Sequence, residues 1–487
     1  MRVSSVHQRQ QGAAANDNSD IELTNANPGS DPTPSPDHDV APSTPVDNKP
    51  SQLRQITVVL AGFVVVSMTC SIVFSFGVYQ ALYEEMAKQP NTPFTGCSSA
   101  LIGLIGTLAL SLMTMGGPLA LNWAKLYSPQ VVISAGGILF GVAFILASYS
   151  QYLWEFALTQ GLLVGLGTCM SYVPMTAVAP AWFAKRRGLA MGLIISGTGV
   201  GGMIWPPILR ALIEHVGFRN AMRVSGSIWA VLVAVAGFAL AWEPKFEDRI
   251  RVETRPLREK SILVQIVSFP RLDWQVAKSK KFIAQALGNF TQAAGYSTPL
   301  FFYAAYAQSR GYSATAAANF ITLNNAANFV SRIIIGHAAD KLGRLNALFG
   351  TTLVSAVAVL GFWLPSTFCN NRESCSTKAD VLFFFFTVLY GSFARAYISL
   401  FPASLLELFG VQHFTGVNSA LYLLRGMGAL LGTPLTALLI SQSTALSFSR
   451  TYIRAAITVG VLLAAAAAFS FWVRIEATAK GQRRWKI

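Results

Sequence analysis

The feature that most constrains the fold of this chain is a series of apolar segments that recur about every thirty to forty residues from Ile56 onward. Each segment is long enough for a helix rising 1.5 Å per residue to cross the ~30 Å hydrocarbon core of a bilayer. The segments are continuously apolar, whereas the strands of a membrane β-barrel alternate in polarity. We therefore predict an all-α membrane protein with twelve transmembrane helices in two six-helix pseudo-repeats, the segments being 56–82, 99–121, 131–149, 153–181, 188–212, 222–242, 282–306, 314–336, 346–365, 380–407, 415–440 and 452–473.

The composition supports a lipid bilayer as the main partner. Hydrophobic residues make up 53% of the 487 residues and charged residues only 12%, whereas an average soluble domain is about 25% charged. The formal net charge is +15, but the cations form short clusters between apolar segments instead of covering one face. This pattern is typical of membrane topology and argues against a nucleic-acid partner.

The placement of Lys and Arg predicts the orientation in the membrane. With twelve spans both chain ends lie on one side, and 25 of the 37 Lys and Arg residues fall in the tails and loops of that side. The loops of the opposite side hold six. Because cytoplasmic loops carry an excess of Lys and Arg, we expect a multi-pass protein of the cell membrane with both termini in the cytoplasm.

The same segments divide the chain into parts. The first part is rich in Pro, Asp, Asn and Ser, and such a stretch cannot bury enough apolar surface to become ordered. The longest internal loop carries ten cations, and its segment from Ser261 to Val267 is expected to form a short helix on the membrane surface. We predict a disordered cytoplasmic tail at 1–54, six-helix halves at 55–242 and 282–473, a cytoplasmic linker at 243–281 and a second cytoplasmic tail at 474–487.

Three arginines within the predicted spans are candidate substrate-binding residues. Arg332, Arg395 and Arg425 lie in the eighth, tenth and eleventh spans, and no Asp or Glu lies at comparable depth. A charge inside the membrane costs about 2.5–3.5 kcal/mol on insertion scales, so it marks a function by default. A guanidinium group binds a carboxylate in a bidentate way, so the pattern favours a small organic anion as substrate. The alternative is that each arginine bonds to helix carbonyls or lies nearer an interface.

Two further side chains complete the candidate binding site. Asn328 precedes Arg332 by one helical turn and is expected to orient the guanidinium or to contact substrate. Tyr303 belongs to an aromatic stretch beside Pro299 and is a candidate for lining the cavity, the alternative being simple packing.

The chain lacks the usual marks of an enzyme. Its five histidines form no metal-binding pair such as H-E-x-x-H, and no phosphate-binding loop is present. We therefore expect no catalytic residues, no metal and no cofactor. Cys369 and Cys375 share a predicted extracellular loop, where a disulfide is permitted but not required.

Several motifs resemble the major facilitator superfamily. Gly336-His-Ala-Ala-Asp340-Lys-Leu-Gly343-Arg344, between the eighth and ninth spans, is similar to the cytoplasmic loop signature of that superfamily. The resemblance implies the major facilitator fold, with a conformational latch between the two halves during alternating access. The first copy, from Gly117 to Lys125, has no acidic residue, so the latch is expected to be asymmetric. The candidate latch residues are Asp340, Lys341, Arg344, Lys185, Arg186 and Arg187.

Within the superfamily the chain resembles the monocarboxylate porter family. The segment Trp182-Phe-Ala-Lys-Arg-Arg-Gly-Leu-Ala-Met-Gly-Leu looks like the fifth-helix signature of that family. Lactate-type members carry an Asp and an Arg four residues apart in the eighth helix; Arg332 matches the Arg, but Asn328 stands where the Asp would be. The polar tail and this loss resemble fungal members, some of which export secondary metabolites.

These observations favour a secondary active transporter that exports an acidic or carboxylated secondary metabolite. One alternative is proton-linked or facilitative uptake of a monocarboxylate or vitamin-like nutrient, and protons stay a candidate partner. A second alternative, from another class, is a non-transporting membrane sensor with a transporter fold.

Overall fold

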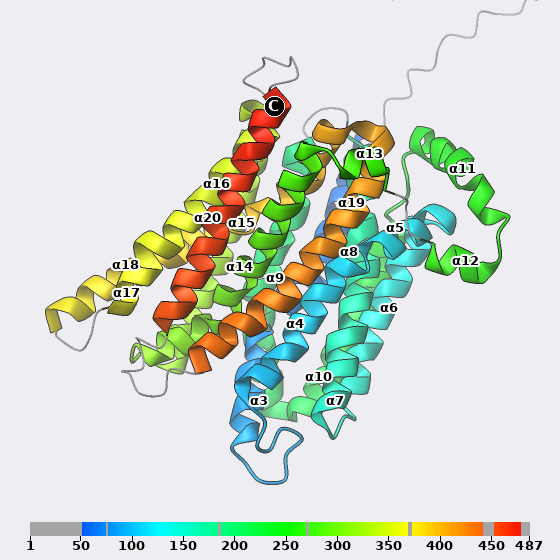
Figure 1. The fold of residues 1–487 in the computed structure, drawn as a ribbon. Helices are drawn as coiled ribbons and strands as arrows, with labels where there is room; N and C mark the ends of the chain where they lie inside the picture. The colour runs from blue at the N-terminus through cyan, green and yellow to red at the C-terminus, as the bar shows by residue number, and fades with distance from the viewer. Residues whose placement is uncertain are drawn as a thin grey trace, which may run out of the picture. The chain divides into compact units, whose positions relative to one another are not determined.

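A computed structural model describes residues 51–74, 76–183, 187–268, 272–368, 373–441 and 452–478. These residues form helices joined by turns, and no strand occurs among them. Most of the long helices run side by side (Figure 1). The prediction of an all-α membrane protein is confirmed.

Ten α-helices and one π-helical segment precede the predicted linker, and we call them the first helix group. The segment η1 interrupts the helix run from α7 to α8, and α6 packs most closely against α10 and α8. The members of this group are α1 (Gln52–Met68), α2 (Cys70–Phe74), α3 (Gly77–Ala87), α4 (Ser99–Met115), α5 (Gly117–Leu126), α6 (Pro129–Ala147), α7 (Leu153–Phe156), η1 (Ala157–Leu163), α8 (Val164–Ala181), α9 (Arg187–Val216) and α10 (Phe218–Phe238).

The remaining helices form the linker and the second helix group. In the second group α14 packs against α20 and α19, and α16 packs against α20. The linker helices are α11 (Pro244–Arg258), α12 (Ile262–Val267) and α13 (Trp274–Ala277). The second group consists of α14 (Lys280–Ser309), α15 (Ala314–Leu342), α16 (Arg344–Ala358), η2 (Val359–Trp363), α17 (Leu364–Phe368), α18 (Glu373–Phe393), α19 (Ala396–Ser441) and α20 (Ile453–Thr478).

The helices account for the predicted spans. Nine helices or helix runs among the described residues are long and apolar enough to cross a membrane, and the pair α4–α5, bent by 46°, makes a tenth. The other two predicted spans are α14 and α15, which have 30 and 29 residues. Buried polar side chains make these two helices less apolar, namely Gln285, Asn289, Gln292, Ser297 and Thr298 on α14 and Asn324, Asn325, Asn328, Ser331 and Arg332 on α15. Polar groups inside a membrane protein mark functional sites, so these two helices are the candidates for carrying one.

Glycines allow α9 of the first group to approach α15 of the second. A Cβ atom placed on Gly192 would lie 2.7 Å from the carbonyl oxygen of Arg332, and one placed on Gly199 would lie 2.7 Å from that of Asn325. Both separations are shorter than real Cβ contacts, so only glycine fits. We call this contact the α9–α15 seam. Small residues of this kind are the usual means by which membrane helices pack backbone to backbone.

The chain bends twice in the region of α18 and α19. Residues Ala394 and Arg395 form a turn between the two helices, and Gly410 interrupts α19 with φ 72° and ψ 171°. The second break falls between the predicted spans 380–407 and 415–440, as the sequence leads one to expect. The first break lies inside a span, where irregular backbone is tolerated only if protein surrounds it. This first break places the cation Arg395 in the interior of the bundle.

Candidate substrate-binding site

Three arginine side chains lie buried inside the bundle. The exposed fraction is 1% for Arg332, 3% for Arg395 and 6% for Arg425. Arg332 belongs to α15, Arg395 to the turn after α18, and Arg425 to α19. Burial of a charge is costly unless the group is paired or hydrogen-bonded. The partners of these three side chains therefore decide what the site can bind.

Each of the three guanidinium groups donates a hydrogen bond to the amide oxygen of an asparagine. A neutral amide orients the guanidinium without cancelling its charge, and no carboxylate of the described residues forms an ion pair with any of the three. The site therefore carries uncompensated positive charge. The bonds are Arg332 Nε to Asn328 Oδ1 (2.9 Å), Arg395 Nη1 to Asn325 Oδ1 (2.7 Å) and Arg425 Nη1 to Asn289 Oδ1 (3.2 Å).

Two of these asparagines also connect the site to the first helix group. The amide nitrogen of Asn328 donates to Oγ1 of Thr198 at 3.1 Å, and that of Asn325 donates to the carbonyl oxygen of Gly202 at 3.0 Å. Both acceptors belong to α9. The positions of two of the three arginines thus depend on the α9–α15 seam, so a movement of one group against the other changes the geometry of the binding site.

Several donors in this region have no acceptor. Nη1 and Nη2 of Arg332 and Nε of Arg395 are buried without a hydrogen-bond partner in the described residues. Buried donors without an acceptor are rare because each costs about 1–3 kcal/mol. A carboxylate that accepts from both terminal nitrogens of Arg332 would satisfy them.

A small cavity lies beside Arg425. Its volume is about 20 Å³, and a single water molecule needs roughly 10–15 Å³. It is therefore large enough for about one water and too small for an organic molecule, so the bundle is closed around it. Its walls are mainly apolar and aromatic, with Arg425 as the charged member, and consist of Phe74, Leu110, Met113, Thr114, Tyr172, Ala293, Tyr296, Ile398, Phe401, Tyr422, Arg425 and Ala429.

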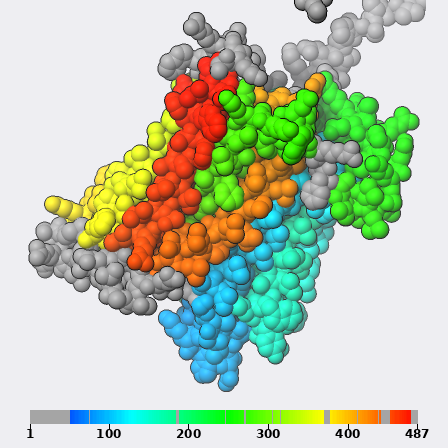
Figure 2. All heavy atoms as spheres, viewed as in Figure 1, coloured from blue at the N-terminus to red at the C-terminus, as the bar shows by residue number. Residues whose placement is uncertain are grey.

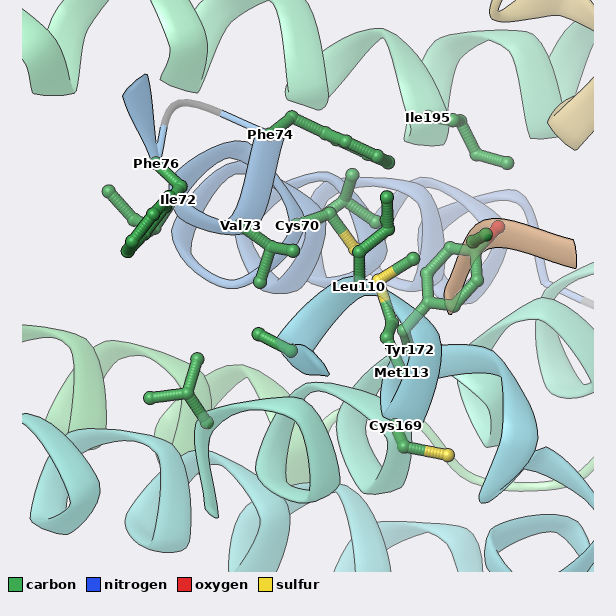
Figure 3. Close-up of a cluster of buried hydrophobic side chains, with 14 of the residues drawn as sticks. Cys70, Ile72, Val73, Phe74, Phe76, Leu110, Met113, Cys169, Tyr172 and Ile195 are labelled. Carbon is green, nitrogen blue, oxygen red and sulfur yellow. The ribbon is translucent and has the colours of Figure 1, made fainter. Parts of the chain in front are cut away.

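The first-group wall of the cavity is part of a larger apolar cluster. Figure 3 shows Phe74 of α2 lying across from Leu110 and Met113 of α4 and Tyr172 of α8. The guanidinium of Arg395 lies 5.5 Å from the ring centroid of Phe74. Both helix groups thus supply aromatic surface to one site, which suits a substrate with an apolar or aromatic body and an acidic group.

Tyr303 lies away from this cavity. Its hydroxyl donates to Oγ1 of Thr387, and its ring stacks on Phe386 with the centroids 5.6 Å apart and the planes at 12°. These contacts correspond to the packing alternative. The cavity is instead lined by Tyr296, which belongs to the same helix two turns earlier.

The geometry can be compared with known proteins. A sequence model of the Major Facilitator Superfamily matches residues 59–374. The chain belongs to this superfamily. Its helical fold and its apolar spans are those of a transporter with many membrane passes.

Curated relatives of this superfamily chain come from fungi. An "MFS-type transporter" of Gibberella moniliformis is 27% identical over 84% of this chain and 89% of its own length. The agnestins efflux protein of Paecilomyces divaricatus is 26% identical over 78% of this chain and 80% of its own length. The aspyridones efflux protein of Emericella nidulans is 27% identical over 77% of this chain and 69% of its own length.

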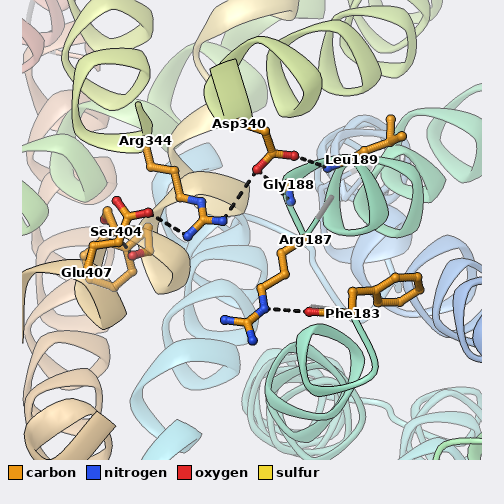
Figure 4. Close-up of polar contacts among 9 residues, drawn as sticks. Phe183, Arg187, Gly188, Leu189, Asp340, Arg344, Ser404 and Glu407 are labelled. Carbon is orange, nitrogen blue, oxygen red and sulfur yellow. Dashed lines mark hydrogen bonds and ion pairs between the residues drawn. The ribbon is translucent and has the colours of Figure 1, made fainter. Parts of the chain in front are cut away.

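The superfamily loop signature forms a polar contact between the two helix groups. The carboxylate of Asp340, on α15, accepts hydrogen bonds at 3.2 Å from the backbone nitrogens of Gly188 and Leu189 at the start of α9. Arg344 bridges Asp340 at 3.5 Å and Glu407 of α19 at 2.7 Å (Figure 4). A carboxylate is stabilised at a helix N-terminus by the helix dipole. We call these five residues the latch cluster.

The other predicted latch residues do not join this cluster in the described structure. Nε of Arg187 donates to the carbonyl oxygen of Phe183 at 2.7 Å, within its own segment (Figure 4). Lys341 is exposed. Lys185 and Arg186 lie outside the described residues. The groups that donate to the Asp340 carboxylate are thus backbone nitrogens of α9, which no charge pattern in the sequence could reveal.

The degenerate first copy of the signature has a different partner. The amide nitrogen of Asn122, on α5, donates to Oγ of Ser268 at 2.8 Å and to the carbonyl oxygen of Gln265 at 3.2 Å. Nε1 of Trp123 donates to the carbonyl oxygen of Ile266 at 3.0 Å. The linker therefore holds α5 in the first copy. In the second copy, a carboxylate bonds to a helix N-terminus instead. The two contacts are asymmetric.

The predicted disulfide falls outside the description. Cys369 lies outside the described residues, and Cys375 is part of α18 but its side chain is not described. The free cysteines of the described part are Cys70, Cys97 and Cys169.

Replacing Asp340 by asparagine is expected to reduce the transport rate about fivefold at unchanged protein abundance. The carboxylate at the N-terminus of α9 is stabilised by about 1 kcal/mol, and the neutral amide loses this together with the Arg344 pair. Initial rates in membrane vesicles measure the effect. The control is Glu214→Gln, which removes a carboxylate from an exposed ion pair with Arg210 on the same helix α9 and should change the rate less than twofold. Equal rates in all three proteins would remove the latch from the mechanism.

Proposed function

We propose that this chain is a secondary active transporter that exports an acidic, largely apolar organic molecule by alternating access. The observation that carries the proposal is the group of three buried arginines whose hydrogen-bonded partners are neutral amides. The missing negative charge is supplied by the substrate, with Arg332 as its main anchor. Arg395 and Arg425 complete the positive field, and the aromatic walls contact the apolar body of the substrate.

The efflux proteins among the relatives support the direction and the class of substrate. Two of them are named for export of agnestins and aspyridones, and similarity along most of the chain makes export of a secondary metabolite the favoured activity here. The fifth-helix motif beginning at Trp182 supports placement in the monocarboxylate porter family. Asn328 in place of an acidic residue supports transport of an anion without a proton held beside Arg332.

The proposed cycle uses the two predicted halves, 55–242 and 282–473, as moving bodies joined by the linker 243–281. The latch cluster and the α9–α15 seam are contacts between those bodies that must open to admit substrate from one side. The excess of Lys and Arg supports a cytoplasmic position for both termini, for the linker and for the latch cluster. The plasma membrane is the proposed location, because a metabolite leaves the cell there.

Counterflow into proteoliposomes with pairs of related compounds tests the proposal. Each pair consists of an aromatic or polyketide carboxylic acid and its methyl ester, which keeps the shape and removes the charge. We expect the acids to accumulate against preloaded acid and the esters to fail. Equal accumulation of acids and esters would contradict an anion site, and accumulation of neither would contradict transport of this class. Inside-out and right-side-out vesicles then distinguish export from uptake.

Replacing Asn328 by aspartate is expected to weaken binding of the anionic substrate about tenfold at neutral pH. The new carboxylate would stand at the position from which the amide oxygen accepts from Arg332 at 2.9 Å, and an ion pair there competes with the substrate. Acidification protonates the carboxyl and restores an uncharged partner, so affinity should rise as the pH falls. Transport at several pH values measures the effect.

A second substitution on the same helix controls for the added charge. Asn324 donates to the carbonyl oxygen of Thr387 at 3.1 Å and bonds to no arginine of the described residues. Asn324→Asp should lower protein abundance without an acid-dependent gain in affinity. If both variants gained affinity in acid, or if Asn328→Asp bound substrate normally at neutral pH, the proposed pairing of substrate with Arg332 would be wrong.

A further inference from the structure

The linker and the first helix group line a second, partly open cavity, separate from the candidate substrate site. Its volume is about 360 Å³, which lies within the range of small-molecule sites. It lies between the end of α5, the start of α6 and one face of α11. Its walls are Ala124, Lys125, Tyr127, Ser128, Trp242, Glu247, Ile250, Arg251 and Arg258. In Figure 2 the linker helices, in green at the right, lie against the first helix group.

The walls of this cavity carry more positive than negative charge. They contain three cations and one carboxylate. Lys125 pairs with Glu253 at 2.9 Å and Arg251 with Glu247 at 3.2 Å. Arg258 has no carboxylate partner in the described residues and donates through Nη2 to the carbonyl oxygen of Leu126 at 2.9 Å. An anion in the cavity would therefore meet at least one guanidinium that is not already paired with a carboxylate.

A helix N-terminus adds to this positive field. Ser128 lines the cavity and is the N-cap of the 19-residue helix α6, where its side chain accepts from the backbone nitrogen of Val131. The free backbone donors and the dipole at such an end favour negative charge. The side chains of Arg251 and Arg258 are seven residues apart on α11, so they lie on the same face of the helix and both face the cavity.

The helix that follows presents apolar side chains to the outside. On α12 the exposed fraction is 69% for Ile262, 75% for Leu263 and 62% for Val267, and no residue of this helix is buried. Segments that lie in the membrane interface combine apolar side chains with neighbouring cations in this way and enter the headgroup region. Hydrogen bonds from Asn122 and Trp123 to the residues that follow Val264 hold α12 at the end of α5.

The depth of the cavity in the membrane follows from its walls. It lies where one candidate span ends, at Leu126, and the next begins, at Pro129. The ends of spans lie at the level of the lipid headgroups. We propose that this cavity is a binding site for the headgroup of an anionic phospholipid, with α12 inserted among the acyl chains beside it. Arg251 and Arg258 bind the phosphate, and the lipid fastens the linker to α5.

Native mass spectrometry of the full-length protein tests this site, with phosphatidylserine compared with phosphatidylcholine of the same acyl chains. We expect phosphatidylserine to bind more tightly. A Lys or Arg near an anionic membrane contributes about 1 kcal/mol, or about fivefold in affinity. The double variant Arg251→Gln with Arg258→Gln should therefore bind phosphatidylserine about 25-fold more weakly. The Arg251 side chain is exposed, and its loss leaves the bond of Arg258 to Leu126 intact. Arg251→Gln alone should therefore bind phosphatidylserine about fivefold more weakly.

The same helix provides a matched control. Arg249 and Arg255 are exposed on α11 and do not line the cavity. Replacing both by glutamine removes the same charge and should change affinity less than twofold. Equal losses in both double variants would mean general attraction between a basic helix and anionic lipid, and no loss in either would mean that lipid binds elsewhere. Both results would overturn the proposal.

A soluble headgroup distinguishes a lipid from a free anion. Glycerophosphoserine should bind far more weakly than the lipid, and Leu263→Ser should weaken lipid binding while leaving glycerophosphoserine unchanged. If glycerophosphoserine or inorganic phosphate bound as tightly as phosphatidylserine, and Leu263→Ser had no effect, the cavity would be a site for a soluble anion and the lipid proposal would be wrong.

Discussion

Replacing Arg332 by alanine is expected to lower transport of an acidic substrate about 100-fold while the protein remains in the membrane. The side chain is 1% exposed, and its two terminal nitrogens have no partner in the described residues. Two charge-assisted hydrogen bonds to a carboxylate, at about 1.5 kcal/mol each, account for a loss of this size. Transport at several substrate concentrations, normalised to protein in the membrane, measures it.

Two further substitutions separate an anchor from a structural role. Arg332→Lys keeps the charge but loses the bidentate geometry, so we expect intermediate affinity. Tyr303→Phe removes another buried polar group, one that bonds to Thr387 away from the cavity. The substrate affinity of this variant should match that of the native protein. Normal affinity in Arg332→Ala would contradict the anchor. Loss of Arg332→Ala protein from the membrane would instead indicate that the arginine supports the fold.

Replacing Gly192 by valine is expected to reduce transport at least about fivefold by opposing closure of the bundle. Even the Cβ atom would lie 2.7 Å from the carbonyl oxygen of Arg332, and an overpacked contact typically costs about 1–3 kcal/mol. Since that contact exists only when α9 and α15 meet, the cost falls on the closed state. The population of the closed state should drop about fivefold or more, and the arginine site would be disturbed with it.

Cysteine alkylation reports the state directly. Cys70 is 1% exposed, so in a chain with this sole cysteine it should react slowly. Gly192→Val should make it react faster. Gly350→Val is the matched control, because a Cβ atom at Gly350 meets nothing within 4 Å. If the Gly350 variant reacted equally fast, or the Gly192 variant transported normally, closure along the seam would not be part of the cycle.

The burial of the three arginines could be predicted from the sequence because charged residues are rare within membrane spans. Arg332 and Asn328 could be joined from their spacing alone, since residues four apart share a helix face. The pairs Arg395–Asn325 and Arg425–Asn289 join residues 70 and 136 positions apart. No local periodicity predicts such pairs. The burial of the arginines was therefore predictable. Their neutral hydrogen-bond partners, which leave the positive charge uncompensated, were not.

The aromatic wall shows a different limit of sequence reasoning. Tyr296 and Tyr303 are seven residues apart, so they lie on nearly the same face of α14. Tyr296 lines the cavity, whereas Tyr303 packs against Phe386. Helical periodicity predicts which side of a helix faces its neighbours but not the depth at which the cavity lies. That depth depends on how helices from both groups meet.

The latch was predictable only in part for a related reason. The motif around Asp340 predicted a contact between helices. The groups that donate to its carboxylate, however, are backbone nitrogens, which every residue except proline supplies. The linker contacts of Asn122 join residues 143 and 146 positions apart. The absence of a carboxylate in the first copy predicted asymmetry, but it did not predict the linker as the replacement.

The neutral amide partners of the buried arginines have a consequence for the energy source of transport. A carboxylate beside an arginine can take up a proton when the substrate leaves, and so can cancel the charge that moves. Asparagine cannot, so on the proposed mechanism each turnover with an anionic substrate moves net charge across the membrane. A membrane potential that is negative inside then favours export by about 2.3 kcal/mol per charge for each 100 mV. On this mechanism the electrical gradient expels the anion without a proton gradient, and a collapse of the voltage alone would slow export.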